Sequence, residues 1–253
     1  MKILRDTGLL FRRKMMETLR NPIYIIMSLL TPVLYLFLFS PLLKNLTNIP
    51  GFASGDVMNV FVPGLLVIVA FLNGLFVGYN MIDEVRNGVI ERFRVTPTSR
   101  FALLAGRVLR DLVNTLVIVN FFALIAVPFG FKIHIVGYLL FMIILSLVLI
   151  TTSSFGNALG LILKDEDRLS PIVQGINLPI LLLSGMLLPM ELAPKWLQYI
   201  AHFNPAYYAV EAGRLLASGR IFEVKVAEAF LFLGLLAILT VTWATRVFSK
   251  AIA

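Results

Sequence analysis

Few residues in this chain of 253 have the types and spacing that chemistry requires. The two histidines, His134 and His202, lie far apart, and no His-Glu-x-x-His motif places two metal ligands on one helix face. Cysteine is absent, which excludes a thiolate metal site. No lysine follows a glycine, so a phosphate-binding loop ending in Gly-Lys-Ser or Gly-Lys-Thr is absent too. We therefore expect this chain to bind no cofactor of its own.

One dense acidic cluster, Asp165 to Asp167, is flanked by Lys164 and Arg168. We interpret it as a solvated turn and not as a metal site. A membrane-embedded enzyme stays open as an alternative, but it would need a nucleophile, base or metal set that we do not find.

The most informative segment runs from Asp83 to Arg107, DEVRNGVIERFRVTPTSRFALLAGR, between two long apolar runs. Asn87-Gly88 is a helix-ending pair. Val89 and Phe93 then fall one turn apart on one face, which predicts a short amphipathic helix over residues 89–95. Its other positions include Ile90, Glu91, Arg92 and Arg94.

The second half of this segment predicts a bend and a new helix. Thr96 precedes Pro97 and is pushed toward extended backbone. Thr98 or Ser99 can cap a helix that continues through Arg107. The alternative is an ordinary loop whose arginines only set topology, but Asp83 and the glutamates of this segment do nothing for topology. We therefore interpret the segment as a docking element for another protein.

Composition places the elements around this segment in a membrane, because 59% of the residues are hydrophobic and the mean hydropathy is +0.91. A helix needs about 20 apolar residues to cross the hydrocarbon core. The predicted class is all-α and polytopic, with about six transmembrane helices in a single domain over residues 1–253. The six runs are approximately Ile23–Leu43, Val57–Ile82, Val108–Phe129, Ile135–Leu163, Ser170–Leu188 and Val226–Phe248.

Lysine and arginine counts orient the chain, since basic flanks stay on the cytoplasmic side. They gather in residues 1–20, in the 83–107 loop, around residues 164–168 and near the C-terminus. We expect a multi-pass protein of the plasma (inner) membrane with both termini cytoplasmic. This topology explains the net charge of +8 better than nucleic-acid binding does.

Residues 1–20 interleave apolar and basic side chains and predict an interfacial helix on membrane lipid. The alternative is a basic tail that only fixes topology. Residues 190–225 are amphipathic but interrupted by Pro194, Pro205 and Gly213, so we expect them to lie at the outer face and not to span.

The charged residues inside the predicted spans indicate which source of energy could drive transport. An ion-driven carrier usually holds an acidic or basic residue inside a span. We place Arg110 and Asp111 at the inner end of the third run and interpret them as interface residues. An ion-driven carrier or a channel stays the alternative function, but ATP hydrolysed by a partner fits the sequence better.

Several stretches resemble the type-2 ABC exporter permeases, and among them the daunorubicin-resistance-like subunits. Phe61-Val-Pro-Gly-Leu-Leu looks like the lead of their second span, and the loop from Glu84 to Arg100 is similar to their coupling helix. Leu183-Ser-Gly-Met-Leu-Leu-Pro189 and the Asn204-Pro205-Ala-Tyr207-Tyr208 stretch resemble the region after their fifth span.

The resemblance implies the membrane half of an exporter: two permease copies, expected as a homodimer, on two copies of an ATP-binding subunit that carries ATP and Mg. The cargo would be a hydrophobic or amphipathic drug, lipid or glycan-type molecule. The residues that it assigns to ATPase coupling are Glu84, Val89, Ile90, Glu91, Arg92, Phe93, Arg94, Thr96 and Pro97. It also implies short re-entrant outer helices, with outer-gate candidates Pro189, Trp196, Asn204, Pro205 and Tyr207.

The resemblance places spans two and five at a central cavity, with Asn73, Phe76, Asn177 and Leu181 as pathway candidates. Two glycine motifs, Gly74-x-x-x-Gly78 and Gly156-x-x-x-Gly160, let helices approach closely. They fit either packing within the chain or a dimer seam, and the motif alone does not choose between these.

Overall fold

The structure is a computed structural model that describes residues 2–20, 30, 32–38, 41, 57–94, 99–186 and 190–252. Within these ranges it contains helices and no strand, which confirms the all-α class. The elements are α1 (Lys2–Leu19), α3 (Val57–Arg86), α4 (Val89–Arg94), α5 (Arg100–Ala126), η1 (Val127–Phe129), α6 (Ile135–Leu163), α7 (Glu166–Leu183), η2 (Met190–Leu192), α8 (Lys195–Ala201), α9 (Pro205–Ala217) and α10 (Val224–Ile252). Residues 32–38 are also helical.

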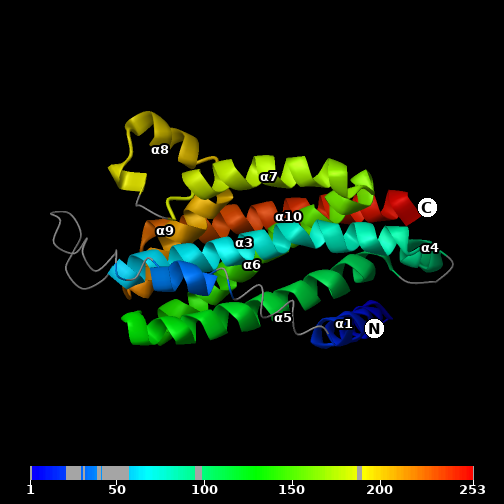
Figure 1. Cartoon of the computed structure of the whole chain (residues 1–253), viewed down its shortest axis with the longest axis horizontal. Coiled ribbons are helices and arrows are strands. Elements are labelled where there is room, and N and C mark those ends of the chain that lie inside the picture. Colours follow the sequence, from blue (N-terminus) through cyan, green and yellow to red (C-terminus); the bar gives the residue numbers. More distant parts are fainter. Residues whose placement is uncertain are drawn as a thin grey trace.

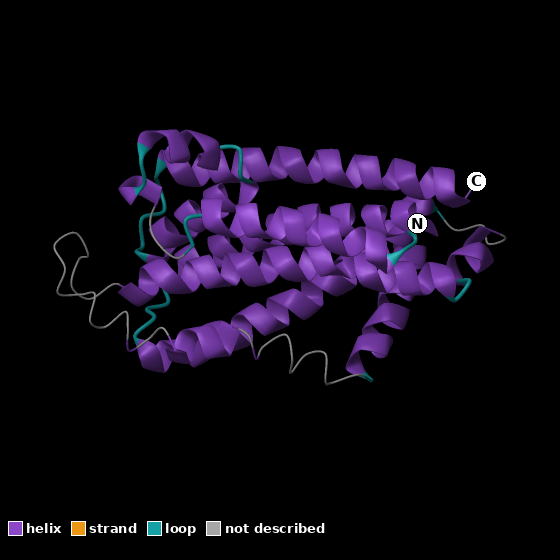
Figure 2. Ribbon diagram, turned by 45° about the horizontal axis from the view of Figure 1, so that its top comes forward, coloured by secondary structure: helices purple, strands orange, loops and turns teal. Residues whose placement is uncertain are grey.

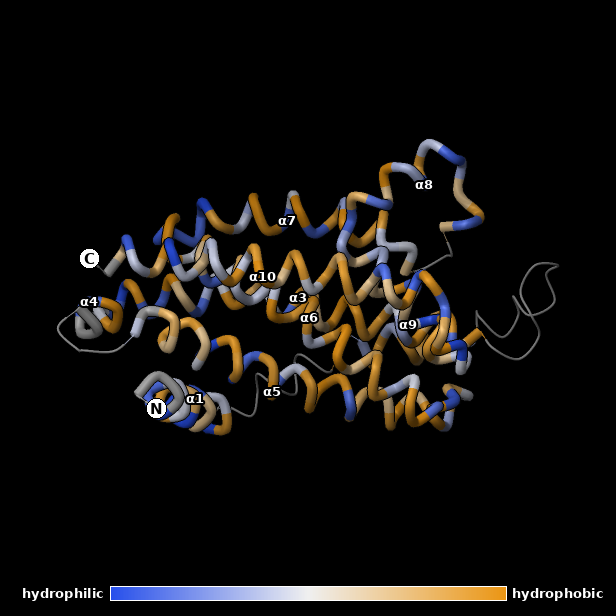
Figure 3. Tube along the Cα trace, turned by 180° about the vertical axis from the view of Figure 1, so that it is seen from behind, coloured by the Kyte–Doolittle hydropathy of each residue, from blue (hydrophilic) through white to orange (hydrophobic). Residues whose placement is uncertain are grey.

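The long helices α3, α6, α7 and α10 run side by side, and α5 crosses the bundle at an angle (Figures 1 and 2). Helices α1 and α4 lie at one end, together with both chain termini. Helices α8 and α9 lie at the other end. Hydrophobic residues follow most of the long helices, and hydrophilic residues gather mainly toward the two ends (Figure 3). We call the end with α1 and α4 the coupling end, and the end with α8 and α9 the distal end.

Four helices in the described part of the chain are long and apolar enough to cross a membrane. They are Val57–Arg86, Phe101–Phe129, Ile135–Leu163 and Val224–Ala251, and they cover the second, third, fourth and sixth predicted spans. Most of the first predicted span, Ile23–Leu43, lies outside the described residues. The count of six therefore stays a prediction.

The fifth span, predicted over Ser170–Leu188, begins and ends earlier than expected. Helix α7 starts at Glu166, because the Asp165 side chain caps it by accepting the Asp167 N–H at 2.9 Å. Acidic residues in a first turn are favoured by the helix dipole. The acidic cluster is thus a helix start and not the turn we expected. With three charged residues in its first turn, this 18-residue helix falls outside the four candidate spans.

The two glycine motifs pack within the chain, which decides between the two alternatives left by the sequence. A methyl group at Gly78 would lie 2.8 Å from the Gly156 carbonyl oxygen, and one at Gly160 would lie 2.3 Å from the Gly78 carbonyl oxygen. Gly74 meets Thr152 in the same way. Helix α3 is buried over most of its length, and its backbone lies directly against that of α6.

We predict that Gly160→Ala lowers the stability of the chain by about 1–3 kcal/mol, because the methyl group has no space between α6 and α3. The measurement is the midpoint of thermal unfolding in detergent. Gly234→Ala is the matched control, since no heavy atom outside its own helix backbone lies within 4 Å of a methyl group there. Equal midpoints for the two variants would contradict the close packing.

Candidate functional site

The turn between α3 and α4 forms as the sequence predicts. The Asn87 N–H donates to the Asp83 carbonyl at 2.9 Å, and the Gly88 N–H donates to the Val85 carbonyl at 3.1 Å. Gly88 has a φ of +65°, a left-handed conformation that glycine adopts without strain. Helix α4 follows at once, so a short, defined turn joins it to the longest helix of the bundle.

Helix α4 has a buried side and an exposed side. Ile90 is 6% exposed and belongs to a core cluster at the coupling end with Met81, Leu103 and Phe248. Glu91 is exposed and Val89 is half-buried. This places α4 against α3 and α10 through Ile90, with Glu91 facing outward.

The remaining coupling candidates are less completely described. Arg92, Phe93 and Arg94 belong to α4, but their side chains lie outside the described part, as do Thr96 and Pro97 entirely. Ser99 occupies the N-cap position of α5 in an extended conformation (φ −62°, ψ 134°), and its side chain makes no capping hydrogen bond. The sequence predicted a helix start here, with Thr98 or Ser99 as the capping residue. At Ser99 the contact is made by the backbone, because the Leu103 N–H donates to the Ser99 carbonyl at 3.1 Å.

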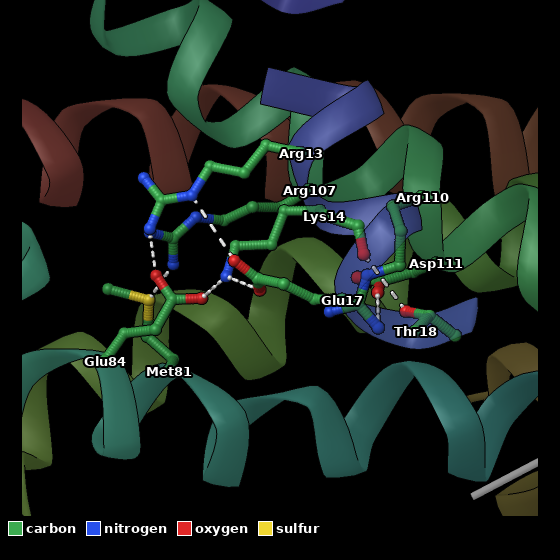
Figure 4. A network of polar contacts seen from close by, with 9 residues as sticks. All are labelled: Arg13, Lys14, Glu17, Thr18, Met81, Glu84, Arg107, Arg110 and Asp111. Carbon is green, nitrogen blue, oxygen red and sulfur yellow. Dashed lines mark hydrogen bonds and ion pairs between the residues drawn. The ribbon is translucent and has the colours of Figure 1, made fainter. Parts of the chain in front are cut away.

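Glu84 lies inside the bundle and not on a docking surface (Figure 4). Its Oε1 is 2.5 Å from Lys14 Nζ of α1, and its Oε2 is 2.5 Å from Arg107 Nη2 of α5. The side chains of Arg107, Lys14 and Glu84 are only 5%, 11% and 14% exposed. One carboxylate therefore joins three helices, and we assign Glu84 a positioning role where the sequence predicted docking.

The Arg107 guanidinium is held by further contacts. It donates to the Met81 sulfur and lies 5.6 Å from the centre of the Phe248 ring. A guanidinium over an aromatic face gains a cation–π attraction. These contacts tie the ion pairs to the same core cluster that holds Ile90.

Arg110 and Asp111 are buried, which corrects their interpretation as interface residues. Their side chains are 10% and 2% exposed, with Arg110 Nη1 3.1 Å from Asp111 Oδ1. Ser153 of α6 donates from Oγ to Asp111 Oδ2 at 2.5 Å. The spacing of Arg107, Arg110 and Asp111 places them on one helix face, and this pattern was the available signal for a buried polar face.

Helix α1 confirms the predicted N-terminal helix and packs tightly on α5. A methyl group at Gly106 would lie 2.8 Å from Leu10 Cβ. On the exposed side, Glu17 pairs with Lys14 at 2.7 Å and with Arg13 at 3.3 Å. Burial alone would raise the pKa of Glu17, but the two cations outweigh it and lower that pKa.

At the distal end, Arg214 of α9 connects three segments. Its Nε donates to the Val60 carbonyl of α3 at 3.1 Å, and its Nη2 donates to the Gly185 carbonyl at 2.5 Å. Its Nη1 donates to Glu211 at 3.1 Å. Burial lowers the pKa of Arg214, and the Glu211 carboxylate opposes that shift. In the sequence, Arg214 lies six residues after Tyr208, the last residue of the Asn204-Pro205-Ala-Tyr207-Tyr208 stretch.

The outer-gate candidates fall on predicted short helices. Asn204 is the N-cap of α9: its Oδ1 accepts the Ala206 N–H at 3.0 Å, while its Nδ2 donates to the Ile180 carbonyl of α7 at 2.8 Å. Pro205 is the first residue of α9, and the Tyr207 ring lies 5.2 Å from that of His202. Trp196 of α8 is 63% exposed. Pro189 lies outside the described residues.

The four pathway candidates come from helices that pack against each other, α3 and α7. Asn73 Nδ2 donates to the Val69 carbonyl of its own helix at 2.9 Å, and Phe76 is 42% exposed. Asn177 and Leu181 are half-buried on α7.

The amino-acid sequence is similar to those of transport permeases. Residues 5–217 match the protein family described as ABC-2 type transporter. The chain is 31% identical to a transport permease, ycf38, of Cyanophora paradoxa, over 85% of this chain and 75% of that protein. It is 26% identical to the daunorubicin resistance ABC transporter permease protein DrrB1 of Streptomyces coeruleorubidus, over 82% and 73%. It is 25% identical to the inner membrane transport permease YadH of Escherichia coli, over 81% and 77%.

We predict that Glu84→Gln destabilises the chain by about 3 kcal/mol, because Lys14 and Arg107 lose the carboxylate that compensates them. The measurement is the unfolding midpoint in detergent. Glu17→Gln is the control, since Glu17 is half exposed and its pairs contribute only about 0–1 kcal/mol. If Glu84→Gln kept full stability and lost only binding to another protein, the docking role would be right and the positioning role wrong.

Proposed function

Because the chain belongs to the ABC-2 type transporter family, we propose that it is the transmembrane permease subunit of an ATP-driven exporter. ATP hydrolysis takes place in a separate ATP-binding subunit, of which the assembly holds two copies. The observation that carries this proposal is α4: a short helix held to the bundle by Ile90, with Glu91 facing outward at the coupling end. The cargo is a hydrophobic or amphipathic drug, lipid or glycan-type molecule.

The contacts around α4 support a route by which force from the ATPase reaches the bundle. The partner pushes on α4, which is joined to α3 through the short turn at Gly88. Helix α3 passes the motion to α1 and α5 through the Glu84 carboxylate and to α6 through the glycine contacts. Of the coupling candidates on α4, Ile90 holds the helix to the bundle, and the exposed Glu91 is the one we propose to meet the partner.

The same arrangement supports a membrane orientation. Both termini, α1 and α4 lie at the coupling end, where the sequence concentrates lysine and arginine. We propose that this end is cytoplasmic and that the chain is a multi-pass protein of the plasma membrane. The distal end, with Trp196, Asn204, Pro205 and Tyr207, then forms the outer gate.

Helix α7 supports a second permease copy. Of its residues only Leu169 and Val173 are buried, and Gln174 and Gly175 are exposed at its middle. A polar side chain at lipid depth needs a partner. Gln174 has one within its own helix, Ser170 at 2.9 Å, so the support for a second copy is the exposed face of α7 and not an unpaired amide. We propose that this face of α7 meets a second copy and that Asn73, Phe76, Asn177 and Leu181 line the pathway beside it.

Asp111 favours an ion-driven carrier, because a buried carboxylate inside a candidate span often marks an ion site. Its two oxygens face Arg110 and Ser153. We therefore assign Asp111 to the packing of α5 on α6.

We predict that Glu91→Gln leaves assembly intact but uncouples ATP hydrolysis from export, because Glu91 is exposed on α4 and contributes little to the fold. The measurement is the ratio of ATP hydrolysis to cargo movement in the reconstituted complex, with Arg92→Gln as a second variant. Glu228→Gln, an exposed glutamate of α10 on the distal half, is the control. Unchanged transport in both α4 variants would contradict the coupling role.

We predict that a cysteine at Gln174 forms a disulfide-linked dimer, because this face of α7 lies at the proposed interface. The natural chain has no cysteine, so each variant carries a single thiol. Leu235→Cys, on an exposed position of α10, is the control and should stay monomeric. Membranes that contain each variant are oxidised mildly, and the electrophoretic mobility of the protein then distinguishes monomer from disulfide-linked dimer. Equal cross-linking at the two positions would contradict the proposed interface.

A further inference from the structure

A cavity of about 240 Å³ opens at the coupling end, beside the Glu84 ion pairs. Three helices contribute to its wall: Lys14, Glu17 and Thr18 from α1, Asn80, Asp83 and Glu84 from α3, and Arg110 from α5. Figure 4 shows Lys14, Glu17, Thr18, Glu84 and Arg110 around this region. The proposed function uses Glu84 as a link between helices but assigns no ligand to this cavity.

Three groups in the wall have unused capacity for polar contacts. The side chain of Arg110 is only 10% exposed, and its Nε is buried and has no hydrogen-bond partner. Within the described residues, no hydrogen bond or ion pair engages the Asp83 carboxylate or the Asn80 amide, which lie one turn apart on α3. Arg110 lines the cavity, so its guanidinium is a cation that an anionic group of a ligand could meet there.

The charges of the wall select the kind of ligand. A simple anion would meet the Glu17, Asp83 and Glu84 carboxylates, and a simple cation would meet Lys14 and Arg110. A group that carries both charges can place its anion on Arg110 and its cation on Asp83. The wall therefore matches a zwitterion better than either single charge.

The volume of the cavity and its position along α3 restrict the class of ligand further. Pockets for whole drug-sized ligands hold about 300–1,000 Å³, so this cavity suits a polar headgroup whose tails lie outside it. Asp83 follows Ile82, the last residue of the buried apolar run of α3. The neighbouring α1 exposes Leu9, Met16 and Leu19 together with Arg12, and Arg20, directly after this helix, is also exposed, which suits a membrane interface. The cavity thus lies at headgroup depth.

We propose that this cavity binds the ammonium–phosphate headgroup of an aminophospholipid. The phosphate accepts hydrogen bonds from the Arg110 guanidinium and the Asn80 amide, and the ammonium donates to the Asp83 carboxylate. The lipid bridges α1, α3 and α5 beside the Glu84 ion pairs. The inference uses the membrane insertion of the proposed function but not its coupling mechanism.

The test is native mass spectrometry of the purified full-length chain in micelles that contain phosphatidylethanolamine, phosphatidylcholine or phosphatidylglycerol. The choline group cannot donate a hydrogen bond, and the glycerol group has no cation. We expect phosphatidylethanolamine to be retained most tightly. Asp83→Asn should weaken its binding about tenfold, because a hydrogen bond to a charged group is lost. Asp167→Asn, an exposed acid at the start of α7, is the control and should bind as the natural chain does.

A second variant keeps the test independent of folding. Arg110→Gln leaves Asp111 without its ion pair and can unfold the chain, whereas Asn80→Leu removes a phosphate donor without uncovering a buried charge. Equal phosphatidylethanolamine binding by Asp83→Asn, Asn80→Leu and the Asp167→Asn control would overturn the site. Equal retention of phosphatidylglycerol by the natural chain would overturn it as well.

A second experiment asks whether the bound lipid is transported or stays in place. It uses vesicles that contain the complete transporter and phosphatidylethanolamine. Surface labelling of its amine measures whether ATP moves the lipid between leaflets. Movement that Asp83→Asn abolishes identifies a transported lipid, and binding without movement identifies a resident one; both results support the site. Lipid binding is measured without ATP, so its failure is distinct from a failure of Glu91→Gln to uncouple the transporter.

Discussion

The arrangement of the coupling end depends on one carboxylate, that of Glu84. Two cations from different helices, Lys14 and Arg107, share it at 2.5 Å each. A buried charge is costly unless it is paired, so all three helices must stay in register for these charges to remain compensated. Helix α1, which alone would be only an amphipathic helix on the membrane, is in this way made part of the bundle.

Helix α3 connects this constraint to the rest of the molecule. At the coupling end it holds Glu84 and continues through Gly88 into α4. Along its length the glycines at 74 and 78 bring its backbone against α6. At the distal end its Val60 carbonyl accepts a hydrogen bond from Arg214. A displacement of α4 therefore acts on a helix that also packs against α5, α6, α7 and α9, which suits the proposed transfer of force from an ATPase to a membrane pathway.

Local features of the fold could be predicted from the sequence, and contacts between distant segments could not. The turn at Asn87-Gly88 and the short helix after it follow from neighbouring residues alone. The partners of Glu84 do not, because Lys14 is distant in the sequence and positive charge near a span also satisfies topology. Asp111 was misplaced for a related reason: hydropathy locates a span but not which face is buried. The glycine motifs showed close packing, and only the structure identified which helix fills the space.

In the proposed function, α4 receives force from an ATP-binding subunit. The most direct measurement places a photo-crosslinking amino acid at position 91 in the membrane of intact cells and identifies the cross-linked protein by mass spectrometry. We expect a cross-link to an ABC ATP-binding subunit at position 91 and none at position 228, on the distal half. Cross-links to lipid alone at position 91, with transport by the purified chain under an ion gradient, would contradict the proposed function.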